Sequence, residues 1–389
     1  MTIDVKLLQR VKVIDTNNLA QTLLTILKSE NYQRPLFVMD SFLAKVQIVQ
    51  DSQKLLQDNH IDFAVFDKVV SDPPAQTIRD GVAAFEVAQA DSIIAIGGGS
   101  SIDVARGINI VRTNGGDILD YTDPSKPIEL CKGLIAVPTT SGTGSEMSNA
   151  LVVTDVKSEK KLAILSDNAV SEYAILNPDL LLSLPQRMTI ATGLDAFSHA
   201  AEGYTSRLAS PVTDAICEKV MFLLYNYLPR AVKNGQDREA RQRVMVAAAL
   251  AGWMLNNAGT NAGHSIAHVL GSKYHIVHGE AVAYALPAVL QRVAPMMPQK
   301  VCEIGQILGE EYAADESQEE RIRRAIHAYQ NFRDNILGLH PFGDYDISSA
   351  EIMSNAKAVS EEQFASNMPG DMNEAVAKEL LSTFGERLN

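Results

Sequence analysis

Cysteine is scarce in this sequence of 389 residues, which has only Cys131, Cys217 and Cys302. The three are far apart and form no Cys-x-x-Cys pair, so the pattern fits neither a disulfide framework nor a cysteine-based metal site. Widely spaced, unpaired thiols are typical of proteins in a reducing compartment. The cysteine pattern therefore predicts a cytoplasmic protein.

Positive charge and long apolar runs are also scarce. Lysine and arginine number 34 against 47 aspartate and glutamate residues, which gives a formal net charge of −13 at pH 7. Because nucleic acids and anionic membranes are themselves negative, this balance argues against both as partners. No apolar run approaches the roughly 20 residues of a membrane-spanning helix. The N-terminal stretch MTIDVKLLQRVKVID lacks the apolar core of a signal peptide.

The first half of the chain alternates short apolar runs with segments of helical periodicity. The pattern predicts strands at 35–40, 61–67, 91–100 and 133–140, and helices at 18–32, 46–60 and 74–89. Such alternation is typical of βαβ units around a parallel sheet.

From about Leu184 onward the pattern becomes almost entirely helical, with long helices predicted at 205–226, 237–256 and 319–335. Pro185 marks a plausible junction, since proline disfavours helix in the residue before it. Because the chain is too long for one comfortable core, two domains are expected. We predict an α/β domain over 1–184 and an all-helical domain over 185–389.

Two glycine-rich loops follow predicted strands of the α/β domain. The turn Gly97–Ser100 leads into a helix, whose N-terminal amides and dipole favour a bound phosphate. It is not a G-x-G-x-x-G fingerprint, because Ile102 occupies the place of the third glycine. The second loop, 138–149, is rich in glycine and in hydroxyl groups suited to a ribose, a phosphate or a nicotinamide. Since both loops open at the carboxyl edge of the sheet, they predict a nucleotide site, with a purely structural turn as the alternative.

Asp40 ends the first predicted strand of that sheet. A carboxylate at such a position can accept hydrogen bonds from a ribose 2′-hydroxyl and repels a 2′-phosphate, which favours NAD over NADP. The alternative is that Asp40 only starts the turn after the strand.

Histidines crowd one segment of the helical domain. Four of the chain's eight histidines fall close together, at His264, His268, His275 and His278. A fifth, His199, follows Asp195 by four residues, a spacing that places both side chains on one helix face. Imidazole is the commonest metal ligand in proteins. One carboxylate and three imidazoles suit Fe²⁺ or Zn²⁺, so we predict a metal site of Asp195, His199, His264 and His278.

The remaining histidines have other expected roles. His268 lies one turn after His264. Since it is not among the predicted ligands, it could transfer a proton or support one of the ligands. His275, three residues before His278, could serve in either of these two ways. Taken singly, each of these histidines could also be an ordinary structural residue.

Four ordered motifs resemble those of the iron-dependent (group III) alcohol dehydrogenases. They are GGGSSID (97–103), PTTSGTGSE (138–146), GLDAFSHAAEGY (193–204) and the histidine segment 264–279. The resemblance runs nearly end to end, although 337–370 matches least. Where many members read His-Ile-Pro-His-Gly, this chain has HIVHG at 275–279 with the histidine spacing kept.

The resemblance implies a dinucleotide-binding domain and a helical metal domain, with the active site in the cleft between them. It implies NAD and a divalent ion, Fe²⁺ in preference to Zn²⁺, on the four ligands named above. Its cofactor contacts fall on Asp40, Gly97, Gly98, Gly99, Ser100, Asp103, Thr139, Thr140, Thr143 and Lys161. His268 matches a family histidine beside the nicotinamide and is the expected catalytic residue.

The expected reaction is hydride transfer between NAD(H) and a small primary alcohol, diol or aldehyde, with the ion acting as a Lewis acid. The alternatives are a polyol or hydroxy-acid dehydrogenase of the same fold, or a metal-dependent hydrolase or lyase. A non-catalytic NAD-binding module would leave the metal ligands without a purpose. Base rates among oligomers predict a homodimer.

Overall fold

The computed structural model describes residues 6–158 and 160–387. Contacts divide the chain into two compact units. The α/β unit comprises Leu8–Thr140 and Gly144–Ser183. The helical unit comprises Ser141–Thr143, the described chain from Leu184 onward, and the described residues that precede Leu8.

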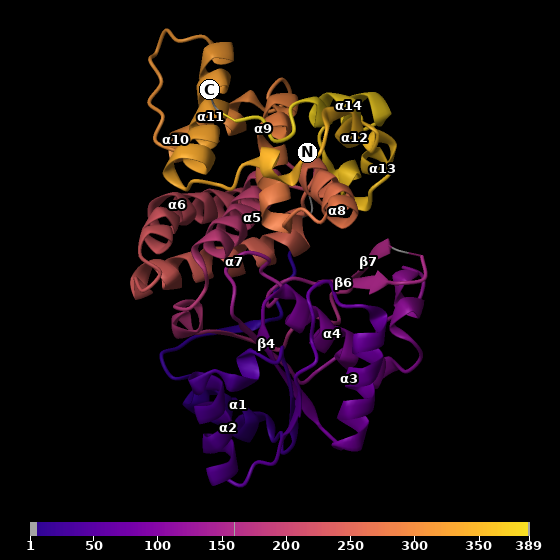
Figure 1. The fold of residues 1–389 in the computed structure, drawn as a ribbon. Coiled ribbons are helices and arrows are strands. Elements are labelled where there is room, and N and C mark those ends of the chain that lie inside the picture. The colour runs from indigo at the N-terminus through magenta and orange to yellow at the C-terminus, as the bar shows by residue number, and fades with distance from the viewer. Residues whose placement is uncertain (1–5, 159, 388–389) are drawn as a thin grey trace. The chain divides into compact units, whose positions relative to one another are not determined.

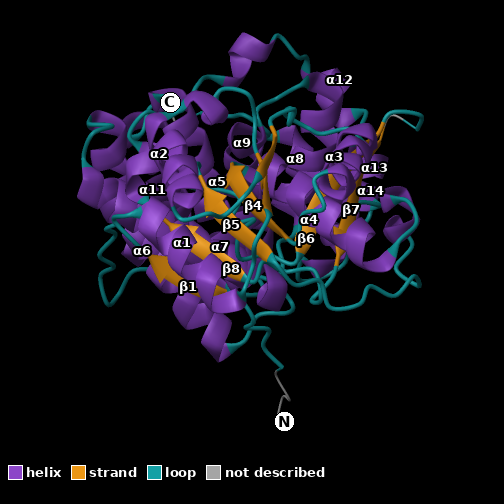
Figure 2. Cartoon of the chain, turned by 90° about the horizontal axis from the view of Figure 1, so that it is seen from below, coloured by secondary structure: helices purple, strands orange, loops and turns teal. Residues whose placement is uncertain are grey.

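The α/β unit is built on a six-stranded sheet in which all neighbouring strands run parallel. From one edge to the other, the strands are β1 (Lys12–Asp15), β8 (Tyr173–Leu176), β5 (Leu134–Pro138), β4 (Ser92–Gly97), β2 (Pro35–Val38) and β3 (Ala64–Phe66). Strands β1, β8, β5 and β4 lie side by side in Figure 2. The predicted fold class, a parallel α/β sheet followed by a helical part, is confirmed.

Helices cover both faces of this sheet because its inner strands β2, β4, β5 and β8 are apolar and buried throughout. Every residue of β4 is buried, which is typical of a strand with helices above and below it. Ile93 and Ala95 pack with α3 (Ala75–Val87) and α4 (Gly99–Asn114). Ile94 and Ile96 point to the opposite face, which α1 (Leu19–Glu30) and α2 (Gln47–Asp58) cover (Figure 1). The period of two along the strand therefore divides the unit into two cores.

Three features of the α/β unit were not predicted from the sequence. The edge strand β1 reads KVID and is largely exposed, so no apolar run marks it. Strand β8 is only four residues long. The antiparallel hairpin β6 (Ala150–Asp155) and β7 (Lys160–Leu165) carries charge and is mostly half-buried or exposed. Charged and exposed strands give little hydrophobic signal, which explains why β1 and the hairpin were missed.

The helical unit surrounds one long, almost fully buried helix, α5 (Gln186–Tyr204). Its other helices are α6 (Pro211–Lys233), α7 (Arg238–Ala258), α8 (Ala262–Tyr274), α9 (His278–Val293), α10 (Pro298–Ile307), α11 (Gln318–Asn331), α12 (Ser349–Met353), α13 (Ala356–Ser360) and α14 (Glu374–Ser382). A π-turn, η4 (Phe332–Ile336), extends α11, and short 3₁₀ segments include η5 (Phe342–Tyr345) and η6 (Gln363–Asn367). Among the described residues, no helix is both long enough and apolar enough to cross a membrane.

The predicted helix over 205–226 was wrong at its start. Helix α6 begins at Pro211, because Ser210 forms a capping box with Thr213 and Pro211 occupies the first turn. Serine before proline is a recognisable helix start. The periodicity of the apolar residues alone did not locate it.

Candidate functional site

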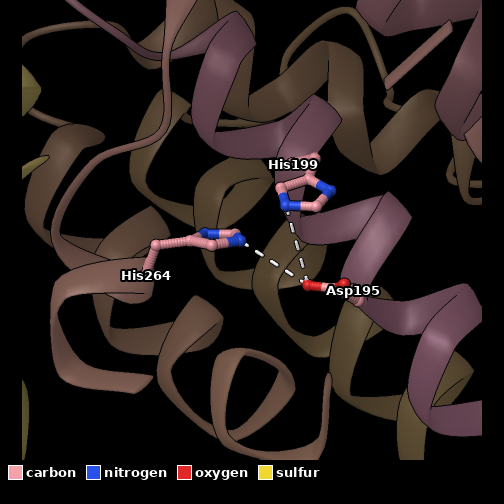
Figure 3. A group of neighbouring side chains, drawn as sticks. All are labelled: Asp195, His199 and His264. Atoms are coloured by element: carbon pink, nitrogen blue, oxygen red, sulfur yellow. Dashed lines mark ion pairs between the residues drawn. The ribbon is translucent and has the colours of Figure 1, made fainter. Parts of the chain in front are cut away.

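Three helices of the helical unit supply the predicted metal ligands. Helix α5 carries Asp195 and His199 one turn apart, α8 carries His264, and α9 begins at His278. The Nε2 atoms of His199, His264 and His278 lie 3.7, 3.6 and 3.6 Å from the same oxygen, Oδ1 of Asp195. Figure 3 shows His199 and His264 directed at this carboxylate. The structure thus brings together all four residues that the sequence spacing singled out.

The atoms at the centre of this group lack ordinary partners. Asp195, His199 and His264 are 2%, 4% and 3% exposed. Within the described chain, Oδ1 of Asp195 and Nε2 of His264 are buried and have no hydrogen-bond partner. Leaving such an atom unpaired costs about 1–3 kcal/mol. A cation coordinated by both atoms would satisfy them at once, which makes Asp195 and His264 candidate metal ligands.

The charges in the group favour a carboxylate at its centre. Burial alone would raise the pKa of Asp195, but the three imidazoles outweigh burial and hold the pKa well below its ordinary value. Burial lowers the pKa of His199 to about 4, against the opposing charge of Asp195. Asp195 is therefore ionised and His199 neutral near pH 7, which are the protonation states that metal ligands require.

Glu202, three residues after His199 on α5, fixes the orientation of His264. Its Oε1 lies 2.8 Å from Nδ1 of His264, and its Oε2 accepts hydrogen bonds from the backbone N–H groups of Asn261 and His264. Since a fully buried carboxylate accepts here, Nδ1 of His264 carries a proton, and Nε2 is the nitrogen that faces Asp195. A Cβ at position 263 would lie 2.4 Å from Oε1 of Glu202, so this contact requires Gly263.

The carboxylate of Glu202 also changes the pKa of His264. Burial alone would lower the pKa of His264, but Glu202 and Asp195 outweigh it and raise the pKa to about 10. A metal ion at Nε2 must therefore displace a proton from this ring, which couples metal uptake to proton release.

A second buried carboxylate holds the start of α9, where His278 lies. Tyr345 accepts a hydrogen bond from the backbone N–H of Val277 at 3.1 Å and donates one to Oε2 of Glu280 at 2.8 Å. Glu280 is fully buried and forms two further bonds, of 2.7 and 3.1 Å, with Arg187. This network ties η5 to the first turn of α9 and so fixes the backbone that carries His278.

The other two histidines of the segment have separate environments. His268 stacks on His278, with ring centroids 5.4 Å apart, and its Nδ1 lies 2.9 Å from Oε1 of Glu362. His275 is exposed and ends α8 in a left-handed conformation, with φ of 56°. The conformation gives His275 a helix-capping role, although asparagine or glycine is more usual there.

The predicted cofactor residues of the α/β unit gather at the carboxyl ends of adjacent strands. Asp40 follows β2, the turn Gly97–Ser100 follows β4, and Thr139 and Thr140 follow β5. The backbone N–H of Thr139 donates to the carbonyl of Gly97 at 3.0 Å, which links the two glycine loops. Helix α4 begins within the turn, so its first amides are available to an anion.

The turn after β4 needs glycine for a steric reason. Gly97 has φ of 155°, and a Cβ there would lie 2.2 Å from Oγ of Ser101. The glycine therefore lets the chain turn directly from β4 into α4.

Several predicted cofactor side chains already bond to the protein. Oδ1 of Asp40 accepts from the backbone N–H groups of Phe42 and Leu43 at 2.8 and 3.0 Å. Asp40 therefore does start the turn after its strand, and its carboxylate is held in place there. Asp103 accepts from the N–H of Val152 at 3.1 Å, and Lys161 pairs with Asp72 at 2.7 Å. Thr143 groups with the helical unit.

Arg106 supports the second glycine loop and was missed from the sequence. The guanidinium of Arg106, on α4, is fully buried and donates to the carbonyls of Ser145 and Ala150. It thereby ties the helix that starts at the first glycine loop to the end of the second. Burial raises the pKa of Glu146 to about 7, although its own backbone N–H and the charge of Arg106 act in the opposite direction.

Sequence models of one family match both parts of the chain. The model for the iron-containing alcohol dehydrogenase matches residues 11–178. The model for the C-terminal part of the Fe-containing alcohol dehydrogenase family matches residues 189–384.

Individual relatives and a solved structure agree with this match. An NAD-dependent methanol dehydrogenase from Bacillus methanolicus is 33% identical over 89% of this chain and 90% of its own length. A 1,3-propanediol dehydrogenase from Klebsiella pneumoniae is 36% identical over 72% of each chain. The crystal structure of a 1,3-propanediol oxidoreductase superposes with a TM-score of 0.91 at 30% identity, covering 97% of this chain and all of the other.

Proposed function

The chain belongs to the iron-containing alcohol dehydrogenase family, and from that premise we propose a site for the reaction in this sequence. The protein is an NAD-dependent oxidoreductase that transfers a hydride between NAD(H) and an alcohol or aldehyde. Asp195, His199, His264 and His278 hold the iron ion. The observation that carries the proposal is that, in the described chain, one buried atom on Asp195 and one on His264 have no hydrogen-bond partner.

The donor set fits iron chemically. One carboxylate and three imidazoles, with no thiolate, suit Fe²⁺ and also accept Zn²⁺. When bound, the ion supplies a Lewis acid that polarises an aldehyde carbonyl and lowers the pKa of an alcohol. Glu202 and the network of Glu280 and Tyr345 keep His264 and His278 oriented before the ion arrives, which lowers the entropic cost of binding it.

The cofactor contacts follow from the loops at the carboxyl edge of the sheet. The turn Gly97–Ser100 and the first amides of α4 suit the pyrophosphate of NAD, and the hydroxyls of Thr139 and Thr140 suit its ribose or nicotinamide. One oxygen of the Asp40 carboxylate caps the turn, and the other accepts a ribose 2′-hydroxyl. Asp103, Thr143 and Lys161 enter the proposal through the family resemblance.

His268 is the proposed proton carrier. Oxidation of an alcohol sends a hydride to NAD⁺ and leaves one proton from the hydroxyl, which a neutral imidazole can accept directly or through water. His268 stacks on the proposed ligand His278 and is 28% exposed at its side chain, so the ring reaches both the site and solvent. Reduction of an aldehyde reverses the transfer.

The proposed substrates are small primary alcohols, diols and the corresponding aldehydes. Two of the relatives are named for methanol and 1,3-propanediol, which supports this size class. We also propose assembly as a homo-oligomer and a cytoplasmic location, the second supported by three free cysteines.

A substrate screen tests the proposed function. Iron-loaded protein is assayed by NADH absorbance with short alcohols and diols in one direction and short aldehydes in the other. We expect turnover of at least one such pair with NAD(H), and loss of turnover in Asp195→Asn. A protein with stoichiometric metal and bound NADH that oxidises or reduces no member of the screen would contradict the proposal. Hydrolysis of an ester or phosphate without any use of NAD(H) would favour the hydrolase alternative.

A further inference from the structure

Glu362 belongs to the part of the chain that matched known motifs least, yet it contacts the histidine segment directly. It precedes the 3₁₀ helix η6 and caps it by accepting a hydrogen bond from the N–H of Phe364 at 2.8 Å. Helix α8 packs against η6, which brings the Glu362 side chain to two residues of α8. Nothing in the sequence around Glu362 indicates such a role.

Both carboxylate oxygens of Glu362 have defined partners. Oε1 lies 2.9 Å from Nδ1 of His268. Oε2 accepts from the hydroxyl of Ser265 at 2.6 Å and from the N–H of Phe364. The Glu362 side chain is only 17% exposed, and Ser265 is fully buried. The carboxylate is therefore locked in one orientation by bonds on both oxygens.

The carboxylate is held in its charged form. Burial alone would raise the pKa of Glu362, but the bonds from His268 and Ser265 outweigh it and leave the pKa below its ordinary value. A charged carboxylate has no proton to donate, so in the bond to a neutral His268 the imidazole must be the donor. The proton of the neutral ring is then on Nδ1, and the lone pair is on Nε2.

Aromatic neighbours fix the ring plane. His268 stacks on His278 with 18° between the planes, and its centroid is 5.5 Å from that of Phe364. With Nδ1 bonded to Glu362 and the ring held between these neighbours, the Nε2 lone pair has one direction. Of the two nitrogens, only Nε2 is left to exchange a proton.

We propose that Glu362 is a positioning residue that holds His268 in the tautomer protonated on Nδ1, with Nε2 free for the reacting hydroxyl. This inference rests on the proposed function, because it assigns the geometry of the proton transfer that His268 performs. During alcohol oxidation the O–H proton goes to Nε2 of His268 while the hydride goes to NAD⁺. The aldehyde and NADH leave, and the imidazolium returns its proton to water. Glu362 itself neither gains nor loses a proton.

Replacing Glu362 with Gln tests the tautomer directly. The amide oxygen can keep the bonds from Ser265 and Phe364, but its NH₂ group then faces Nδ1 of His268 as a donor. His268 must accept there, which moves the ring proton to Nε2 and removes the lone pair from the reacting side. We expect kcat to fall about 10- to 100-fold, with KM, the Kd for NADH and metal content near wild type. Glu362→Asp, which retains the carboxylate, should recover part of the lost rate.

A spectroscopic measurement separates positioning from stability. Proteins with ¹⁵N-labelled histidine, loaded with diamagnetic zinc, are compared by NMR, and His268→Ala identifies the His268 signals. We expect the protonated nitrogen to be Nδ1 in wild type and Glu362→Asp, and Nε2 in Glu362→Gln. Glu361→Gln, a change at the exposed neighbouring residue, is the matched control and should alter neither kcat nor the tautomer.

The outcomes distinguish this inference from the proposed function. Unchanged kcat in Glu362→Gln, or a fall in kcat without a change of tautomer, would overturn the positioning role. A wild-type protein with Nδ1 protonated but no dehydrogenase activity on any substrate would contradict the proposed function and leave the tautomer assignment standing.

Discussion

Side chains form the proposed metal centre, whereas backbone groups form most of the proposed cofactor site. The proposed metal centre is made of side chains from α5, α8 and α9, and two of its inner atoms, Oδ1 of Asp195 and Nε2 of His264, have no hydrogen-bond partner in the described chain. The cofactor site is made mostly of backbone, where glycine turns end parallel strands and a helix begins. Side chains near those loops, such as Asp40 and Asp103, already bond to the protein.

This difference determines how each site tolerates change. A side-chain ligand cannot be replaced by its neighbours, so loss of one should abolish metal-dependent chemistry. Backbone amides survive most substitutions, so a change in one side chain of the cofactor loops should adjust selectivity or stability. The predictions below test that contrast from the largest expected effect to the smallest.

Loss of a metal ligand should have the largest effect. His264→Ala removes one of four proposed ligands, and we expect turnover to fall by about 10³-fold or more, as for a loss of several kcal/mol of Lewis-acid stabilisation. Metal content should fall with it, while NADH fluorescence titration saturates as in wild type. His275→Asn is the matched control, because it changes an exposed histidine of the same segment and asparagine tolerates its left-handed conformation. Full activity in His264→Ala would exclude His264 as a ligand.

Loss of the carboxylate behind His264 should have a smaller effect. Both oxygens of Glu202 accept hydrogen bonds, so the NH₂ group of Glu202→Gln must face a donor on one side. We expect metal affinity to fall about 10- to 100-fold, measured by competition with a chelator. Activity should return substantially at saturating metal. Glu218→Gln, at an exposed position on α6, provides the comparison. Unaltered affinity in Glu202→Gln would show that Glu202 does not orient the ligand.

In the α/β unit, the ionisation of Glu146 should make the free energy of unfolding depend on pH. Its folded-state pKa of about 7 lies above the ordinary value of 4.5, so its contribution to stability is present below about pH 4.5 and lost as the pH rises through 7. Wild type should lose unfolding free energy on the order of 1–3 kcal/mol as the pH rises, and we expect Glu146→Gln to remove this loss. Urea midpoints at pH 5 and pH 8 measure it, with Glu129→Gln as an exposed control. Parallel pH profiles for wild type and Glu146→Gln would contradict the assignment.

Cofactor choice should show the smallest change. Asp40→Asn keeps an oxygen to cap the turn but removes the charge that repels a 2′-phosphate, so we expect the preference for NAD over NADP to weaken by about tenfold. The ratio of kcat/KM for the two cofactors measures this, and Asp40→Gly tests the charge and the cap together. A wild-type protein that already uses NADP as well as NAD would mean that Asp40 has no such role.

The same contrast explains what the sequence could predict. The metal-ligand candidates share helical spacing or lie in the crowded histidine segment, so their positions along the chain marked them as candidates, and the family resemblance agreed with this choice. Glu202 had a signal as well, because it follows Asp195 and His199 by seven and three residues and shares their helix face. Glu280 had only its place directly after the histidine segment. Tyr345 and Glu362 had no signal, since single acidic or aromatic residues far along the chain become partners only through tertiary packing.

In the fold, apolar strands with helices on both faces were predictable, and weakly apolar ones were not. Strand β4 is an unbroken apolar run and was located closely, whereas β1 and β7 are exposed and charged. The glycine turns of the cofactor loops could be recognised in the sequence. No spacing rule predicts that Asp103 bonds to Val152 or that Lys161 pairs with Asp72.

The central claim is that hydride transfer requires the metal ion, whereas the α/β unit binds NAD without the ion. A large α/β core does not depend on a metal for folding as a zinc finger does. The most direct measurement compares chelated and iron-reconstituted protein by NADH titration and by turnover with the best substrate. The account predicts equal NADH affinity in the two samples and no hydride transfer in the chelated one, with activity restored by added iron. Substantial dehydrogenase activity in protein shown to be metal-free would contradict it.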